Sequence, residues 1–187
     1  QNKSNDTLKQ YTLYMPGAQR KVVFEAFTAS TCPPCASENP FLDAFISARI
    51  DSIVPVKTHV WWPLPGNDPM YLANTTQIQP RVQTYYAVSA VPTLIVDGII
   101  VQVSDYSTLS NLLNPYNTRM SKGSPLSVNV VDTKIGDSIK TNITVTVISP
   151  LPTGNYKLRV NSISTKVSYS TPPGSNGEMT FKDVFRF

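Results

Sequence analysis

The sequence has few of the groups that bind metals or nucleic acids. Its 187 residues include two cysteines and one histidine. A structural zinc site needs about four ligands, so these side chains do not complete one. Lys and Arg occur singly or as the pair Arg20-Lys21, and the formal net charge is +4. Because proteins that bind nucleic acids carry clustered basic residues, we expect no nucleic acid partner. We also expect no metal and no other cofactor.

Long apolar segments are missing as well. No apolar run approaches the roughly 18 residues that a transmembrane helix needs, so we expect no membrane span. The start, Gln1 to Asp6, is polar and lacks the apolar centre of a signal peptide. Charged residues make up only 15% of the chain, whereas Thr, Ser, Asn and Pro are frequent. This composition favours an exported protein, periplasmic or secreted and outer-membrane-associated, including association with the cell surface.

The two cysteines stand together in Cys32-Pro33-Pro34-Cys35. An apolar run, Val22–Phe27, precedes them and a helical pattern follows. A cysteine at a helix N-terminus has a lowered thiol pKa, because free N–H groups and the helix dipole favour its thiolate. We therefore predict that Cys32 attacks disulfides and that Cys35 resolves the mixed disulfide. Pro33 and Pro34 donate no N–H and stiffen the loop.

Other uses of the pair remain open. A four-residue disulfide ring closes little chain entropy and would be a weak structural staple. An inert buried pair, or a degenerate site kept as scaffold, is a second alternative. Redox exchange is the use that the position before a helix favours most.

The pattern up to residue 120 predicts alternating strands and helices. Pro40 should kink or restart the first helix, and Asp97-Gly98 is typical of a two-residue hairpin turn. The expected strands are 8–14, 22–27, 53–60, 93–96 and 99–101, and the expected helices are 36–50, 80–88 and 105–120. Together they indicate an α/β domain over residues 1–120, a central mixed sheet with flanking helices.

The residue pattern changes from mixed helix and strand to strand alone at Ser121. Beyond a linker, the alternating runs 126–131, 139–148 and 156–167 predict strands, and no helical pattern occurs. We expect residues 121–187 to form a small all-β module, comparable to part of a β-sandwich or immunoglobulin-like domain. Its end at Phe187, within a strand-like run, suggests a truncated module.

Three features together resemble the thioredoxin superfamily: the strand before Cys32-Pro33-Pro34-Cys35, Pro40 in the following helix, and Val91-Pro92-Thr93 leading into a strand. The resemblance covers about residues 20–120. It implies a thioredoxin-like fold in which Pro92 is a cis-proline facing the cysteine pair. It also implies that Val91 offers its backbone to an extended substrate, with Thr93 beside it.

The motif C-P-P-C-x-x-E-x-P resembles TlpA-like extracytoplasmic reductases. The β-rich tail and the Trp-rich loop, residues 61–69, look more like secreted or outer-membrane-associated bacterial proteins with a thioredoxin-like front module. The resemblance implies a thiol–disulfide oxidoreductase that reduces protein thiol/disulfide substrates. An electron-donor protein would then reduce its own disulfide. The alternative is a non-enzymatic secreted or surface binding protein with a vestigial site.

The sequence departs from thioredoxins at two positions. Thr31 replaces the usual Trp before the first cysteine, and Ala26 stands where thioredoxins bury an acid. Glu25 is adjacent but should point to the opposite face by strand alternation. Either a bulge brings Glu25 under the pair as a catalytic acid, with Lys57 as its partner, or no buried carboxylate assists Cys35.

Other side chains near the motif have two readings each. His59 in a strand is more typical of a hydrogen-bonded structural residue than of a base. Trp61, Trp62 and Tyr71 either line a substrate groove or cover the core beneath an inserted loop. Glu38, one turn after Cys35, tunes the pair or is simply solvated.

Overall fold

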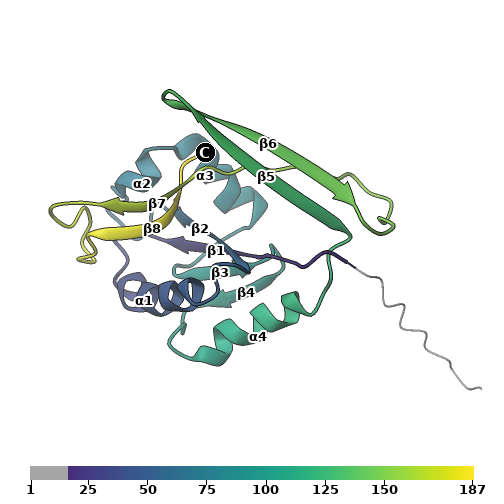
Figure 1. The fold of residues 1–187 in the computed structure, drawn as a ribbon. Helices are drawn as coiled ribbons and strands as arrows, with labels where there is room; N and C mark the ends of the chain where they lie inside the picture. Colours follow the sequence, from purple (N-terminus) through teal and green to yellow (C-terminus); the bar gives the residue numbers. More distant parts are fainter. Residues whose placement is uncertain (1–16) are drawn as a thin grey trace, which may run out of the picture. The chain divides into compact units, whose positions relative to one another are not determined.

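The structure, a computed structural model, describes residues 17–187. The expected strand at 8–14 lies outside the described residues. The chain divides into two compact units. The larger unit contains residues 20–122 and 155–187, and the smaller one contains 123–154 together with residues 17–19 (Figure 1).

The larger unit is built on a six-stranded mixed sheet in the order β4-β3-β1-β2-β8-β7. The neighbours β1 and β2, and β2 and β8, are parallel, while the remaining pairs are antiparallel. The strands are β1 (Val22–Thr28), β2 (Ile53–His59), β3 (Thr93–Val96), β4 (Ile100–Val103), β7 (Ile163–Ser168) and β8 (Thr180–Phe185).

Helices cover both faces of this sheet. Figure 1 shows α1 and α4 on one face and α2 and α3 on the other. The helices are α1 (Pro33–Ser47), α2 (Pro69–Leu72), α3 (Thr75–Pro80), the π-helix η1 (Arg81–Tyr85) and α4 (Leu109–Met120). This layered arrangement confirms the α/β fold that the sequence predicts.

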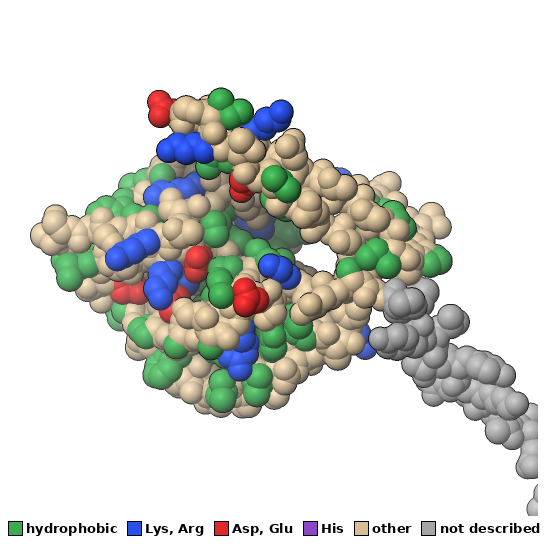
Figure 2. All heavy atoms as spheres, viewed as in Figure 1, with side chains coloured by type: hydrophobic (Ala, Val, Ile, Leu, Met, Phe, Trp, Pro, Cys, Tyr) green, Lys and Arg blue, Asp and Glu red, His purple; other side chains and the backbone are tan. Residues whose placement is uncertain are grey.

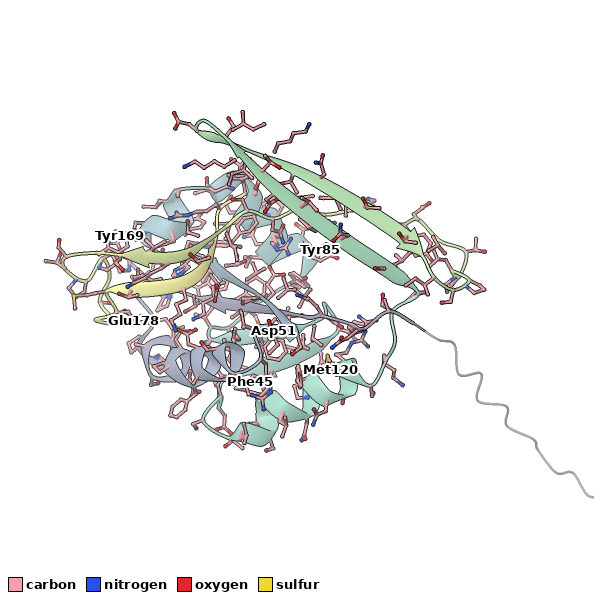
Figure 3. The ribbon with its side chains drawn as sticks, in the orientation of Figure 1. Phe45, Asp51, Tyr85, Met120, Tyr169 and Glu178 are labelled. Atoms are coloured by element: carbon pink, nitrogen blue, oxygen red, sulfur yellow. A yellow bond between two sulfur atoms is a disulfide. The ribbon has the colours of Figure 1, made fainter. Side chains whose placement is uncertain are left out.

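Alternation along β1 separates two hydrophobic cores. Phe24 and Ala26 belong to the core beneath α1 and α4, which also contains Phe45. Phe45 stacks on Phe24 with ring centroids 5.8 Å apart, and Figure 3 shows it between α1 and α4. Phe27 belongs to the second core, which includes both cysteines and faces α3 and η1.

Several predicted elements are confirmed and two differ. The turn at Asp97-Gly98 joins β3 to β4, and both of its residues have positive φ, 51° and 69°. α1 continues through Pro40 without restarting. The residues after Pro40, namely Leu42, Phe45 and Ile46, remain buried in the core against the sheet. The helix expected at 80–88 is instead α3 followed by η1, since Asn74 caps a helix that begins five residues earlier, at Thr75.

The expected domain boundary at 120/121 is wrong for the last strands. β7 and β8 belong to the central sheet, where β8 pairs in parallel with β2. β8 places Phe181, Val184 and Phe185 in the interior. This burial draws the end of the chain back to β2, and a change of composition at residue 121 does not reveal such long-range pairing.

The smaller unit is a two-stranded antiparallel sheet of β5 (Leu126–Ile135) and β6 (Ser138–Val147). It confirms a small β module, with two strands where the sequence predicts three. Register places Val128, Val130, Ile143 and Val145 on one face, opposite a mainly polar face. Hairpins of two strands are marginally stable alone, so this apolar face contributes stability only when covered.

The surface carries mixed charge. On the face drawn in Figure 2, Lys and Arg side chains are interspersed with Asp and Glu rather than gathered in one patch. Among the helices of residues 17–187, none has both the length and the apolar composition that crossing a bilayer requires.

Candidate active site

Cys32 and Cys35 form a disulfide at the start of α1. Cys32 is the N-cap residue, and the N–H of Cys35 donates a hydrogen bond to Cys32 Sγ at 3.1 Å. Pro33 and Pro34 occupy the first helical positions, where a missing N–H costs nothing. Both prolines are exposed, whereas Cys32 and Cys35 are 1% and 0% exposed.

A short buried turn delivers the pair from β1 to α1. After β1 ends at Thr28, the N–H of Cys32 donates to the carbonyl of Ala29 at 3.1 Å. Ser30 and Thr31 in this turn are also buried. Thr31 Oγ1 donates to the carbonyl of Pro63 at 2.8 Å, which ties the turn to the Trp-rich loop. The residue that replaces the usual Trp therefore anchors that loop.

The segment before β3 faces the disulfide. The Val91–Pro92 peptide bond is cis, in agreement with what the resemblance implies. The carbonyl oxygen of Val91 lies 3.7 Å from Cys32 Sγ. Thr93 is buried, and its Oγ1 donates to the carbonyl of Ala90 at 2.8 Å, so its hydroxyl already has a partner.

Asp68 is a buried residue that the sequence interpretation missed. Its Oδ2 accepts hydrogen bonds from the N–H of Ser30 at 2.6 Å and from His59 Nδ1 at 2.7 Å. Burial acts to raise the pKa of Asp68, but the bond and charge of His59 and the amides of Ser30 and Tyr71 outweigh it, and the pKa lies below the usual 3.8. Asp68-Pro69 is a recognisable helix start, but the neighbouring sequence does not predict the hydrogen bond of Asp68 to Ser30.

His59 is confirmed as a hydrogen-bonded structural residue. Ser30, His59 and Asp68 are the residue types of a hydrolytic triad, and all three are buried. However, Ser30 Oγ and His59 Nε2 have no hydrogen-bond partner among the described residues, so they are not bonded to each other. The set supports the turn below Cys32 and does not form a nucleophile–base pair.

Asn176, in the β7–β8 loop, is a second residue that the sequence interpretation missed. Its N–H donates to the carbonyl of Ser30 at 3.0 Å. Its Nδ2 donates to the carbonyls of Ala29 and Cys32 at 3.1 Å and 3.3 Å. The sequence offers no signal for this contact, because the loop lies far along the chain.

Glu25 is 1% exposed, and its carboxylate bonds to Arg81 and Thr58. Its carboxylate forms an ion pair with Arg81, whose Nη2 lies 2.7 Å from Oε2, and accepts from Thr58 Oγ1 at 3.2 Å. Ala26 lies in the first core, so Glu25 points to the opposite face, as alternation predicts. The expected partner Lys57 instead pairs with Asp43 of α1 at 2.5 Å.

The Trp-rich loop packs beside the cysteines. Trp61 and Trp62 are half-buried against the second core, with ring centroids 4.6 Å apart. Leu64 is 87% exposed at the tip of the same loop. Glu38 accepts a hydrogen bond from the N–H of Tyr106 at 2.6 Å, so it is not simply solvated.

Comparisons with known proteins find similarity in structure alone. No family model matches the chain, and no curated protein matches it. HBP35 of Porphyromonas gingivalis is similar over 92% of this chain and 57% of its own, with a TM-score of 0.62 and 15% identity.

Two further solved structures are more distant. A protein from Agrobacterium tumefaciens covers 68% of this chain and 58% of its own, with a TM-score of 0.47 and 19% identity. Tryparedoxin I from Leishmania major covers 56% of this chain and 81% of its own, with a TM-score of 0.37 and 24% identity. The chain thus spans 57% and 58% of the first two proteins, and the likeness concerns the fold.

Proposed function

We propose that this chain, whose fold is thioredoxin-like, is a thiol–disulfide oxidoreductase that works through Cys32 and Cys35. One observation carries the proposal. Cys32 caps a 15-residue helix, and the N–H of Cys35 points at its sulfur from 3.1 Å. In the reduced protein, this N–H and the helix dipole stabilise a thiolate on Cys32, which lowers its pKa below the usual value of about 8.5.

The reaction is a two-electron exchange. The Cys32 thiolate attacks one sulfur of a substrate disulfide, which forms a mixed disulfide and releases the other substrate sulfur as a thiolate. Cys35, once deprotonated, attacks the sulfur of Cys32, closes the Cys32–Cys35 disulfide and releases the second substrate thiolate. The substrate gains two electrons and takes up two protons. A donor protein with a dithiol then reduces Cys32–Cys35 by the reverse exchange.

The residues around the disulfide form the proposed docking surface. Pro33 and Pro34 are exposed between the two cysteines, and the carbonyl oxygen of Val91 lies 3.7 Å from Cys32 Sγ. Trp61 and Trp62 flank the pair from the Trp-rich loop, and Thr93 fixes the segment behind Val91. Because Cys32 is 1% exposed, a substrate reaches its sulfur only after neighbouring side chains shift.

The proposed setting is outside the cytoplasm, with the pair acting as a reductant of protein disulfides. The small share of charged residues, 15%, supports an exported protein. The resemblance of C-P-P-C-x-x-E-x-P to extracytoplasmic reductases supports the direction. Association with the cell surface belongs to the same proposal.

The deciding experiment titrates Cys32 alkylation against pH in the reduced protein. The Cys35→Ser variant isolates Cys32, and Cys32→Ser is the matched control. We expect a thiol pKa clearly below about 8.5, and a potential between about −270 and −120 mV when the dithiol form equilibrates with glutathione. Reduction of insulin gives the activity readout, and Cys35→Ser should retain substrates as mixed disulfides.

The competing function, a non-enzymatic binding protein with a vestigial pair, predicts the reverse. A Cys32 pKa near 8.5 together with no insulin reduction would overturn the enzymatic proposal. Removing residues 123–154 then tests the β5–β6 hairpin as the binding part. A cut at residue 121 is unsuitable, because it also deletes β7 and β8 from the central sheet.

A further inference from the structure

The β7–β8 loop binds the backbone that carries the attacking cysteine. The Nδ2 group of Asn176 donates to the carbonyls of Ala29 and Cys32 at 3.1 Å and 3.3 Å, and its main-chain N–H donates to Ser30 at 3.0 Å. Asn176 thus bonds to the carbonyl groups of three of the four residues from Ala29 to Cys32. Such a set of bonds restricts the backbone of the turn.

Glu178 connects this contact to α1. Its Oε2 accepts from Asn176 Nδ2 at 2.6 Å, so the two amide protons of Asn176 are shared among three acceptors, and its Oε1 accepts from Asn39 Nδ2 at 2.9 Å. The N–H of Glu178 donates back to Asn176 Oδ1 at 2.9 Å. Figure 3 shows Glu178 beside α1. Asn39 lies one turn after Cys35, so the network joins both ends of the Cys-x-x-Cys segment.

The loop is fitted closely to the turn. A Cβ atom on Gly174 would lie 2.5 Å from both the carbonyl carbon and Oγ of Ser30. No side chain fits at that separation, so only glycine permits the approach. The contact is therefore part of the packing of the turn and not a chance neighbour of an exposed loop.

We propose that Asn176 is a positioning residue for the thiol chemistry of Cys32, an inference that rests on the proposed function. It acts through the backbone. By holding the carbonyl of Cys32, it keeps the sulfur aligned with the N–H of Cys35, the group that stabilises the thiolate. It also places an amide dipole beside the turn and partly neutralises the carboxylate of Glu178.

These three effects change the thiol pKa in the same direction. Without the carboxamide, the turn loosens, the amide dipole is lost and the negative charge of Glu178 is less compensated. Each change disfavours the thiolate, so the pKa of Cys32 should rise. Since a stabilised thiolate makes a pair more oxidising, the potential of Cys32–Cys35 should become more negative.

The test compares Asn176→Ala with Ser175→Ala, a neighbour whose side chain is exposed in the same loop. We expect Asn176→Ala to slow alkylation of Cys32 at pH 7 by about threefold to tenfold, the effect of losing one ordinary hydrogen bond. The dithiol–disulfide equilibrium should shift by a similar factor, about 30 mV per tenfold. Ser175→Ala should match the wild type. Circular dichroism establishes that each variant is folded.

A purely structural role would give a different result. In that case Asn176→Ala lowers the melting temperature while the alkylation profile and the potential match those of Ser175→Ala, and the inference is overturned. If Asn176→Ala does not fold, Asn176→Leu replaces it, because this variant keeps a side chain of similar size and adds no charge, but loses all three donations of Nδ2. The thiol pKa and the potential can be measured even if insulin is not reduced, so failure of the proposed function is distinguishable.

Discussion

The main-chain N–H of Ser30 donates a 2.6 Å hydrogen bond to the carboxylate of Asp68. On the opposite side, the carbonyl of Ser30 accepts from Asn176 at 3.0 Å. The residue two positions before the attacking cysteine is therefore held by two loops, one after β2 and one after β7. The geometry of the cysteine pair depends on both.

Asp68 should make the protein sensitive to acid. Its pKa is lowered in the folded state, so its contribution is fully present above the usual pKa of 3.8 and is lost as the pH falls through the lowered value. Asp68→Asn should reduce the free energy of unfolding at pH 7 by about 3 kcal/mol, because it removes a buried carboxylate that accepts hydrogen bonds from Ser30 and His59. Urea denaturation between pH 2 and 7 measures both effects.

The control for this prediction is Asp51→Asn, since Asp51 is exposed in the turn before β2 (Figure 3). It should keep the stability and the acid response of the wild type. An Asp68→Asn protein that loses stability in acid as steeply as the wild type would show that other carboxylates govern the response.

Glu25 should contribute to stability rather than to thiol chemistry. Its carboxylate is paired with Arg81. Burial acts to lower the pKa of Arg81, but the hydrogen bond and charge of Glu25 raise it above its usual value. Glu25→Gln should cost about 3 kcal/mol, the lower end for a broken buried pair, because Arg81 keeps some exposure. The alkylation profile of Cys32 and insulin reduction should change little. A clear shift of either would favour the catalytic role that the sequence leaves open for Glu25.

The sequence reveals the elements whose signals are local. The apolar run at Val22–Phe27, the helical spacing after Cys35 and the Asp97-Gly98 turn lead directly to β1, α1 and the β3–β4 hairpin. The fold itself is expected from the resemblance of the Cys-x-x-Cys motif and Val91-Pro92-Thr93 to the thioredoxin superfamily. These features need only neighbouring residues, so pattern and propensity suffice.

The residues that hold the active-site turn, Asp68 and Asn176, could not be found in this way, because their hydrogen-bond partners are distant in the chain. Asp68 and Ser30 are 38 residues apart, and Asn176 and Cys32 are 144 apart. β8 likewise reads as part of a β-rich tail until its pairing with β2 is seen. Asp68 and Asn176 are ordinary helix-start and loop residues by composition, and only the tertiary contact gives them a role.

Gly174→Ala should separate the β7–β8 loop from the active-site turn. The added methyl group would lie 2.5 Å from the carbonyl carbon and Oγ of Ser30, so one of the two backbones must move. Overpacking of this kind costs about 1–3 kcal/mol. The N–H of Asn176 should also exchange faster with solvent, because its acceptor is the carbonyl of Ser30. Urea denaturation and amide hydrogen exchange measure these effects, with Ser175→Ala as the control. Unchanged exchange at Asn176 would mean that the active-site turn moves to accommodate the methyl group while the hydrogen bond from Asn176 to Ser30 persists. The close approach at Gly174 would then not be required for that bond.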